Sequence, residues 1–170
     1  VLDEDHYNEN FTTFEGAVKK DVIETSEGVV LPHGMPGTGK TIYIRHLIST
    51  LNKNMIYLPP DMAHFLSKPN FIPFLLRHKN AVLIVEDAES ILMTREAGDN
   101  QSVSNILNIT DGLLSDVVQV QVICTINTNL SQIDPALRRK GRHIGEYAFK
   151  SLKHARAKAE RRAIGRGTRG

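Results

Sequence analysis

A glycine-rich segment, GMPGTGKT at residues 34–41, has the residue types and spacing of a phosphate-binding loop. It fits the pattern G-x-x-x-x-G-K-[ST] at every fixed position. Glycines allow the backbone to curl so that successive N–H groups point at phosphate oxygens, and the start of a following helix adds partial positive charge. In such loops the lysine, here Lys40, reaches the β- and γ-phosphates, and the hydroxyl of Thr41 ligates Mg²⁺. The pattern therefore predicts that ATP and Mg²⁺ bind here. The residues expected to contact the nucleotide are Gly34, Pro36, Gly37, Thr38, Gly39, Lys40 and Thr41.

Two adjacent carboxylates, Glu86 and Asp87, directly follow the apolar run Ala81–Val85. In nucleotide-hydrolysing proteins with this loop, one acid at the carboxyl end of such a strand holds Mg²⁺, often through water, and a second carboxylate can polarise the attacking water. By position we predict that Glu86 assists the metal and that Asp87 activates the water. The alternative is a strand end that is acidic only because it is solvated. Glu89 and Glu96 lie farther along the chain and are interpreted as solvated.

A further apolar run, residues 118–126, leads into the polar segment Asn127-Thr128-Asn129. A side-chain amide at this position could donate to the γ-phosphate or orient the attacking water. Asn127 is the first choice for this role and Asn129 the second. For either residue, the competing interpretation is a turn residue that precedes a helix.

A basic cluster follows Asp134-Pro135, which is a typical helix start with Asp as the N-cap and Pro in the first turn. The cluster carries four positive charges within the five residues 138–142. Like charges at this density repel one another unless an anion is near, and the triphosphate bound to a neighbouring subunit would be such an anion. A solvated basic turn and a nucleic-acid-binding patch stay open as alternatives.

Strands and helices alternate along the chain, and together they must bring these residues to one place. The patterns predict strands at 28–33, 55–58, 81–85, 118–126 and 144–149, and helices at 40–51, 71–78 and 103–114. Alternation of this kind favours an α/β fold, in which a central parallel sheet is flanked by helices. Pro32 falls inside the first strand and lacks the N–H that a central strand would use, a placement that sheets rarely tolerate.

The chain of 170 residues has 41% hydrophobic and 24% charged residues, proportions that fit a globular domain and exclude a disordered chain. Its net charge of +2 is divided unevenly, because residues 1–149 hold 13 basic and 18 acidic side chains whereas residues 150–170 hold eight basic and one acidic. We therefore expect a lead-in segment at 1–27, a nucleotide-binding core at 28–149 and a basic tail at 150–170. The tail could contact nucleic acid or an acidic partner, or it could be a solvated helix end.

Cys124 is the one cysteine of the chain, and its apolar neighbours indicate a buried position. A single cysteine excludes an intrachain disulfide and a Cys-rich zinc site. No apolar run approaches the roughly 18 residues that span a bilayer, and no signal peptide is recognisable. A cytoplasmic protein without a membrane segment is therefore expected.

The order of these motifs resembles the AAA branch of the AAA+ ATPases. The resemblance rests on the phosphate loop, the Glu86-Asp87 pair, Asn127 and the segment DPALRRKGR at 134–142, and it covers roughly residues 28–149. Within this branch, the sequence is similar to the subgroup that contains the mitochondrial inner-membrane translocase of the Rieske protein, and to its soluble bacterial relatives. That subgroup also tends to have Glu before Asp, and it has a helix that reads much like SNILNITDG at 104–112.

The resemblance implies ATP hydrolysis at the subunit interfaces of a ring, expected to be a hexamer, coupled to remodelling or translocation of an unknown protein substrate. It implies that Arg139 and Arg142 act in trans on the ATP of a neighbouring subunit and that Asn127 senses the γ-phosphate. The helical lid of the family should follow the last strand, and because residues 150–170 are basic we expect the lid to be largely absent. Two other functions stay open. One is a nucleic-acid-dependent P-loop ATPase that uses the basic tail, and the other is a nucleotide-binding module without hydrolysis.

Overall fold

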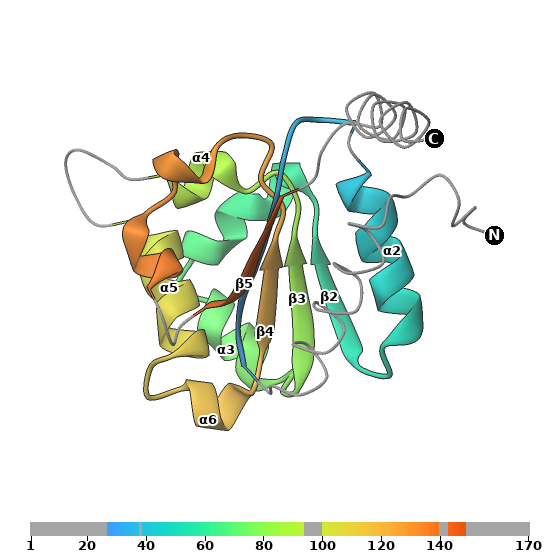
Figure 1. Ribbon diagram of the computed structural model, residues 1–170. Helices are drawn as coiled ribbons and strands as arrows, with labels where there is room; N and C mark the ends of the chain where they lie inside the picture. Colours follow the sequence, from blue (N-terminus) through green and yellow to red (C-terminus); the bar gives the residue numbers. More distant parts are fainter. Residues whose placement is uncertain (1–26, 38, 94–99, 140–142, 149–170) are drawn as a thin grey trace, which may run out of the picture.

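The computed structural model describes residues 27–37, 39–93 and 100–139, together with the backbone of 143–148 (Figure 1). Within these ranges, five strands form one parallel sheet in the order β2-β3-β4-β1-β5. The strands are β1 (Gly28–His33), β2 (Asn54–Leu58), β3 (Ala81–Val85), β4 (Gln121–Cys124) and β5 (His143–Ala148). All of them run in the same direction, so their carboxyl ends meet at one edge of the sheet.

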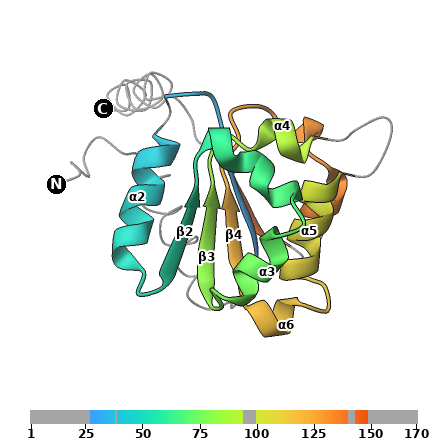
Figure 2. The same ribbon diagram turned by 180° about the vertical axis from the view of Figure 1, so that it is seen from behind.

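Helices cover both faces of the sheet, and the views from the front and from behind agree on this (Figure 1, Figure 2). α2 (Lys40–Thr50) lies on one face, whereas α3 (Phe71–Leu76) and α5 (Gln101–Thr110) lie on the other. The other helical elements are α4 (Glu89–Leu92), α6 (Ser115–Val118) and the 3-10 helices η2 (Pro60–Ser67), η3 (Leu130–Gln132) and η4 (Pro135–Arg138). The predicted α/β fold is confirmed. Among the helices of the described ranges, none combines the length and the apolar character needed to cross a membrane.

The buried side chains of β3 alternate between two cores. Val82 and Ile84 pack beneath α2, while Leu83 and Val85 pack in the larger core on the face of α5. A strand that is buried on both faces reads as an unbroken apolar run, which explains why its bounds match the prediction. This double burial fixes the place where β3 ends and its two acids begin.

The strand predicted at 118–126 is shorter in the structure. Val118 ends α6, and β4 begins only at Gln121. Between them Gln119 has a φ of 51°, and its N–H donates to the carbonyl of Ser115 at 2.8 Å, so the chain turns there. Because Val118 is fully buried although it belongs to a helix, the apolar run crosses the boundary between the two elements.

The helix predicted at 103–114 is displaced toward the N-terminus, since α5 spans Gln101–Thr110. A side chain at Gly112 would place its Cβ 2.7 Å from the carbonyl oxygen of Asn108, so the tight turn after α5 requires glycine. Leu113, which the prediction placed in the helix, has 99% of its surface exposed. The apolar pattern at 113 therefore does not mark a buried helical face.

β1 accommodates Pro32 through a gap in its ladder with β4. The two strands pair from Gly28 to Val30 and meet again at a bridge between His33 and Ile126. Pro32 lies within this gap, and its carbonyl accepts the N–H of Ile126 at 2.9 Å. The missing N–H interrupts the ladder locally without ending the strand. The expectation that a proline is poorly tolerated here is therefore wrong for this sheet.

Cys124 is fully buried at the end of β4, as expected. Burial raises the pKa of its thiol to about 12. We expect the folded chain to react with a disulfide reagent at pH 8 at least about 100-fold more slowly than the chain in denaturant, because the reactive thiolate is both scarce and covered. The absorbance of the released thiol measures both rates. Equal rates would contradict burial of this strand end in solution.

Candidate active site

The loop of residues 34–41 joins β1 to α2 at the carboxyl edge of the sheet (Figure 1). Gly37 and Gly39 have φ values of 76° and 92°, which other residues rarely adopt, so the loop curls where the sequence predicts. Gly39 is also the N-cap of α2, and its carbonyl accepts the N–H of Tyr43 at 3.0 Å. A sharp turn that leads directly into a helix start can present backbone N–H groups to an anion.

Lys40, the first residue of α2, folds beneath this loop. Only 5% of its surface is exposed, and Nζ donates to the carbonyls of Gly34 at 2.7 Å and Met35 at 2.9 Å. Burial lowers the pKa of Lys40, whereas the negative charges of Asp87 and Glu89 act in the opposite direction. The ammonium group is thus held by neutral carbonyl oxygens, and a charged phosphate oxygen would be a stronger partner.

Glu86 follows β3 on the face of the sheet that carries α2. Side chains alternate along a strand, and Ile84, two residues earlier, packs in the core beneath α2. Tyr57 of β2 lies opposite Ile84 in the strand register, and its hydroxyl donates to Glu86 Oε2 at 2.6 Å. This hydrogen bond is the main cause that raises the pKa of Tyr57 to about 12. The acid predicted to assist the metal is therefore held by a tyrosine, on the side of Lys40 and Thr41.

Asp87 leaves the strand through a turn that Thr125 stabilises. Its φ of 51° lies in the left-handed region, which Asp enters more often than most residues. The Asp87 N–H donates to Thr125 Oγ1 at 3.0 Å. The backbone of Thr125 is bonded on both sides, through its N–H to the carbonyl of Val85 and through its carbonyl to the N–H of Ala88, each at 2.9 Å. The exposed Asp87 side chain therefore starts from a turn that the neighbouring strand holds in place.

The amide of Asn127 meets the carboxylate of Asp87. Asn127 Nδ2 donates to Asp87 Oδ1 at 2.6 Å. Asn129 is used differently, because its Oδ1 accepts the N–H of Ser131 at 3.0 Å and caps η3. The sequence does not decide which of the two amides lies at the site. In the structure, Asn127 contacts Asp87, whereas Asn129 caps a helix.

Glu89 lies closer to this group than the sequence indicates. It is the first residue of α4, it is half-buried, and its Oε2 accepts the N–H of Asn127 at 3.4 Å. Its charge also acts on Lys40. The interpretation of Glu89 as a solvated side chain is therefore wrong, because the turn at Asp87 brings the start of α4 back toward the end of β4. Glu96 lies outside the described residues.

Three residues of this group, Tyr57, Thr125 and Glu89, belong to no sequence motif. Tyr57 and Thr125 share a positional signal, since each stands near the carboxyl end of a strand that neighbours β3. In parallel sheets with helices on both faces, ligands bind outside these strand ends. A search restricted to that edge of the sheet could therefore have found both residues.

The basic segment begins as the sequence predicts. Asp134 Oδ1 accepts the N–H of Ala136 at 2.9 Å and caps η4. Arg138 is half-buried and donates through Nη1 to the carbonyl of Leu130 at 3.3 Å, whereas Arg139 is exposed. The predicted site or cluster residues that lie outside the described ranges are Thr38, Lys140 and Arg142.

The oxygen atoms of Thr41 and Glu86 suit Mg²⁺ that arrives bound to a nucleotide. In the part of the chain that the structure describes, no group of three or more His, Cys, Asp or Glu side chains could hold a metal ion by itself. Mg²⁺ that arrives with a nucleotide needs fewer protein ligands, since phosphates and waters complete its shell. The exposed Thr41 at the start of α2 and the Glu86 carboxylate after β3 would supply oxygen atoms of the kind that Mg²⁺ prefers.

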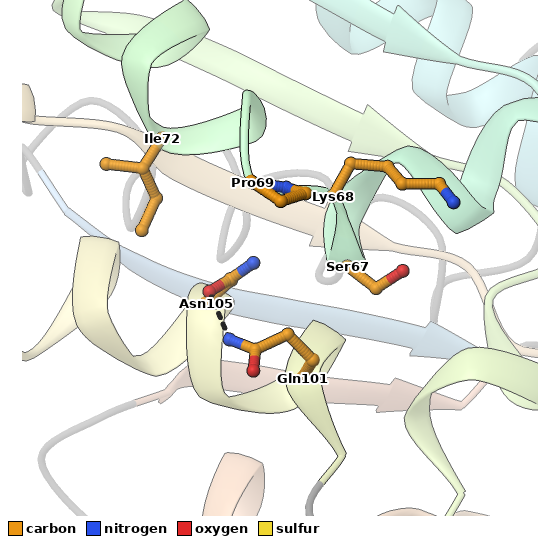
Figure 3. A pocket seen from close by; sticks show the side chains of 6 residues that line it. All are labelled: Ser67, Lys68, Pro69, Ile72, Gln101 and Asn105. Atoms are coloured by element: carbon orange, nitrogen blue, oxygen red, sulfur yellow. Dashed lines mark hydrogen bonds between the residues drawn. The ribbon is translucent and has the colours of Figure 1, made fainter.

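A separate cavity of about 310 Å³ lies between η2, α3 and α5 (Figure 3). It is lined by Ser67, Lys68, Pro69, Ile72, Gln101 and Asn105. Gln101 Nε2 donates to Asn105 Oδ1 at 2.8 Å, and Asn105 Nδ2 donates to the carbonyl of Leu66 at 2.7 Å. The first bond lies within α5 and the second joins α5 to η2, so we interpret the two amides as packing contacts.

Comparisons with known proteins identify a family for most of the chain. A family model described as the ATPase family associated with various cellular activities (AAA) matches residues 30–150. The chain is 27% identical over 132 residues to the ATPase family gene 2 protein of Saccharomyces cerevisiae, covering 71% of this chain and 16% of that protein. It is 26% identical over 175 residues to AAA-ATPase At5g17760 of Arabidopsis thaliana, and the match covers 82% of this chain and 34% of that protein. It is 27% identical over 128 residues to Cell division control protein 48 homolog B of Arabidopsis thaliana, and the match covers 66% of this chain and 21% of that protein.

The chain thus spans about a third or less of the length of these relatives. The residues matched by the family model make up well over half of the 170, and they include the phosphate loop, both acids after β3 and Asn127. Motifs, fold and family model agree over the same stretch, and the chain belongs to the AAA family of ATPases.

Proposed function

We propose that this chain binds Mg-ATP and hydrolyses it to ADP and phosphate. The observation that carries the proposal is the placement of four residues at the carboxyl edge of the sheet: Lys40 from α2, Glu86 and Asp87 after β3, and Asn127 after β4. Asp87 links two of the others, because its charge acts on Lys40 and its Oδ1 accepts from Asn127 Nδ2. Membership of the AAA family supports a module that binds and hydrolyses ATP.

Nucleotide binding begins with an exchange of partners at Lys40. Its ammonium group gives up the carbonyls of Gly34 and Met35 for the β- and γ-phosphate oxygens, which are charged and therefore stronger acceptors. The N–H groups of the curled loop bind the same phosphates. Thr41 and Glu86 would hold Mg²⁺, and the metal would neutralise part of the charge on the phosphates.

Hydrolysis depends on Asp87 and Asn127. The bond from Asn127 Nδ2 engages Oδ1 of Asp87, which leaves Oδ2 to accept a hydrogen bond from the attacking water. The water oxygen attacks the γ-phosphorus in line while its proton passes to Asp87 Oδ2, and the bond from that phosphorus to the bridging oxygen of ADP breaks. Lys40 stabilises the negative charge that the γ-phosphoryl oxygens carry during this step.

We also propose that the site is completed by a second copy of the chain in a ring, expected to be a hexamer. Arg139 is exposed at the end of η4, where it can reach a neighbour, and Arg142 follows three residues later. Their guanidinium groups would stabilise the γ-phosphoryl group in the neighbouring site. The ring would remodel or translocate a protein. The Glu-Asp order and the sequence SNILNITDG support the subgroup of the mitochondrial Rieske-protein translocase and its soluble bacterial relatives.

The ring can be tested through Arg139. Turnover of ATP per subunit is expected to rise steeply with protein concentration. Arg139→Ala should keep ATP affinity within about twofold and lower turnover by about 10³-fold, because such an arginine acts on the transition state. Addition of Lys40→Met subunits, which lack their own ATP site but supply Arg139, should restore part of the activity.

Arg138→Ala is the matched control for this experiment. Arg138 is the preceding arginine, but it donates to Leu130 within its own subunit. Arg138→Ala should therefore leave the rate of ATP turnover in the neighbouring subunit's site largely unchanged. A rate per subunit that is constant with concentration, and unaffected by Arg139→Ala, would contradict a site shared between subunits.

The predictions on the lead-in segment, the lid and the basic tail fall on residues 1–26 and 149–170, outside the described ranges, and they stay predictions. The nucleic-acid alternative depends on that tail. Salt-sensitive DNA binding that is lost on removal of residues 150–170 would support it. A nucleotide-binding module without hydrolysis would bind ATP and release no phosphate. A phosphate-release assay on the oligomeric protein distinguishes it from an ATPase.

A further inference from the structure

Tyr57 lies near the carboxyl end of β2, beside the acid that we assign to the metal. The strand register sets Tyr57 opposite Ile84 of β3, and Glu86 stands two residues farther along the same face. The Tyr57 hydroxyl donates to Glu86 Oε2 at 2.6 Å. This distance is in the range of O–H bonds to a charged oxygen, which are roughly twice as strong as bonds between neutral groups.

Burial does not explain a tyrosine at this position. The side chain is 51% exposed, so its ring adds little to the core beneath α2. Its polar atom is instead committed to a carboxylate at the candidate active site. Because Oε2 of Glu86 is engaged by this bond, the side-chain torsions of the glutamate are restrained, and Oε1 is left for another ligand.

We infer that Tyr57 is a positioning residue, which holds the Glu86 carboxylate ready for the Mg²⁺ that arrives with ATP. The inference rests on the proposed function. A long side chain that is already ordered loses less freedom when the metal binds, so the metal binds more tightly. Partners of this kind orient ligands in many metal sites, and their loss typically weakens metal affinity about 10- to 100-fold.

Tyr57→Phe removes the hydroxyl and keeps the ring. Binding of a fluorescent ATP analogue to the full chain, measured once with Mg²⁺ and once with EDTA, gives the factor by which Mg²⁺ strengthens nucleotide binding. We expect the affinity in EDTA to stay within about twofold, because Lys40 and the loop are untouched. The Mg²⁺ factor should fall about tenfold. A purely structural role would lower both affinities together.

Lys53→Met is the matched control. Lys53 directly precedes β2, at the opposite edge of the sheet, and its Nζ donates to Gln121 Oε1 at 3.1 Å. Its loss removes a side-chain hydrogen bond at the amino end of β2, far from the site, so the Mg²⁺ factor should not change. In the double variant with Glu86→Gln, Tyr57→Phe should have no further effect on this factor, because its target is gone.

The outcomes separate this inference from the proposed function. If the Mg²⁺ factor is unchanged in Tyr57→Phe but lost in Glu86→Gln, the role of Tyr57 is overturned and the proposed function stands. A factor retained in Glu86→Gln, or an equal fall in Lys53→Met, also overturns it. If the wild-type chain binds no nucleotide, the proposed function itself fails.

Discussion

Lys40→Met is expected to weaken ATP binding by roughly 30- to 4000-fold. Removing one partner of a buried, hydrogen-bonded charge pair costs about 2–5 kcal/mol, and about 1.4 kcal/mol corresponds to a factor of ten in affinity. Methionine retains an apolar stem of similar length, so the space beneath the loop stays filled. The change removes the ammonium group that donates to Gly34 and Met35 and that we assign to the phosphates.

The same substitution should lower the free energy of unfolding of the nucleotide-free chain little or not at all. Burial lowers the pKa of Lys40 below its ordinary 10.5, so the charged form is less favourable in the folded than in the unfolded chain. This cost is fully present below the folded pKa and disappears as the pH rises toward 10.5. Near neutral pH, removal of the ammonium group therefore removes two hydrogen bonds and a desolvation cost together.

Calorimetric titration with ATP measures the affinity, and thermal unfolding measures the stability. Lys68→Met is the matched control, because Lys68 is an exposed lysine beside the cavity between η2 and α5. It should bind ATP as the wild type does. Unchanged ATP affinity in Lys40→Met, in a protein that unfolds normally, would exclude Lys40 from the nucleotide site.

The parts of the site that lie within one short segment could be predicted from the sequence. Gly37 and Gly39 adopt the φ values that the loop motif requires, and that requirement is local to the backbone. Ala81–Val85 was predicted with its observed bounds, because burial on both faces leaves an unbroken apolar run that ends at charged residues. Periodicity was less informative at Val118, since a short apolar run does not separate a buried helix end from a strand.

Contacts between elements could not be predicted in this way. Tyr57 and Glu86 are 29 residues apart in the chain, and Asp87 and Asn127 are 40 apart. Each pair meets only because strands that are distant in sequence are neighbours in the sheet with a particular register. The sequence also does not decide whether Asn127 or Asn129 belongs to the site, because both follow the same strand. The cap that Asn129 provides for η3 separates them.

Three consecutive residues after β4 connect the phosphate loop to the acids. Thr125 Oγ1 accepts the N–H of Asp87 at 3.0 Å, and the Ile126 carbonyl accepts the N–H of Gly34 at 3.0 Å. Asn127 Nδ2 then donates to the Asp87 carboxylate at 2.6 Å. The position of Asp87 relative to the loop is therefore set by β4, the strand that lies between β3 and β1. A change in this segment would act on phosphate binding and on the acid at once.

Asp87→Asn is expected to keep Mg-ATP binding within about threefold and to lower turnover by about 10²- to 10⁴-fold, the usual contribution of a positioned acid or base. The two side chains have the same shape, and the amide oxygen of asparagine can still accept the bond from Asn127 Nδ2. Asparagine also tolerates the φ of 51° at this turn. What is lost is the charge that polarises the water. Single-turnover hydrolysis at saturating Mg-ATP measures this loss separately from binding.

Glu86→Gln distinguishes the roles of the two acids in the same assays. If Glu86 holds the metal, its replacement should weaken the binding of Mg-ATP but not of ATP in EDTA, an effect that Asp87→Asn should lack. Asp116→Asn, in α6 at the far edge of the sheet, should match the wild type in both assays. The two assignments are reversed if Glu86→Gln keeps Mg-ATP affinity and loses turnover while Asp87→Asn loses affinity. The order Glu-Asp would then place the water-activating acid first, on the face of α2, beside the hydroxyl of Tyr57.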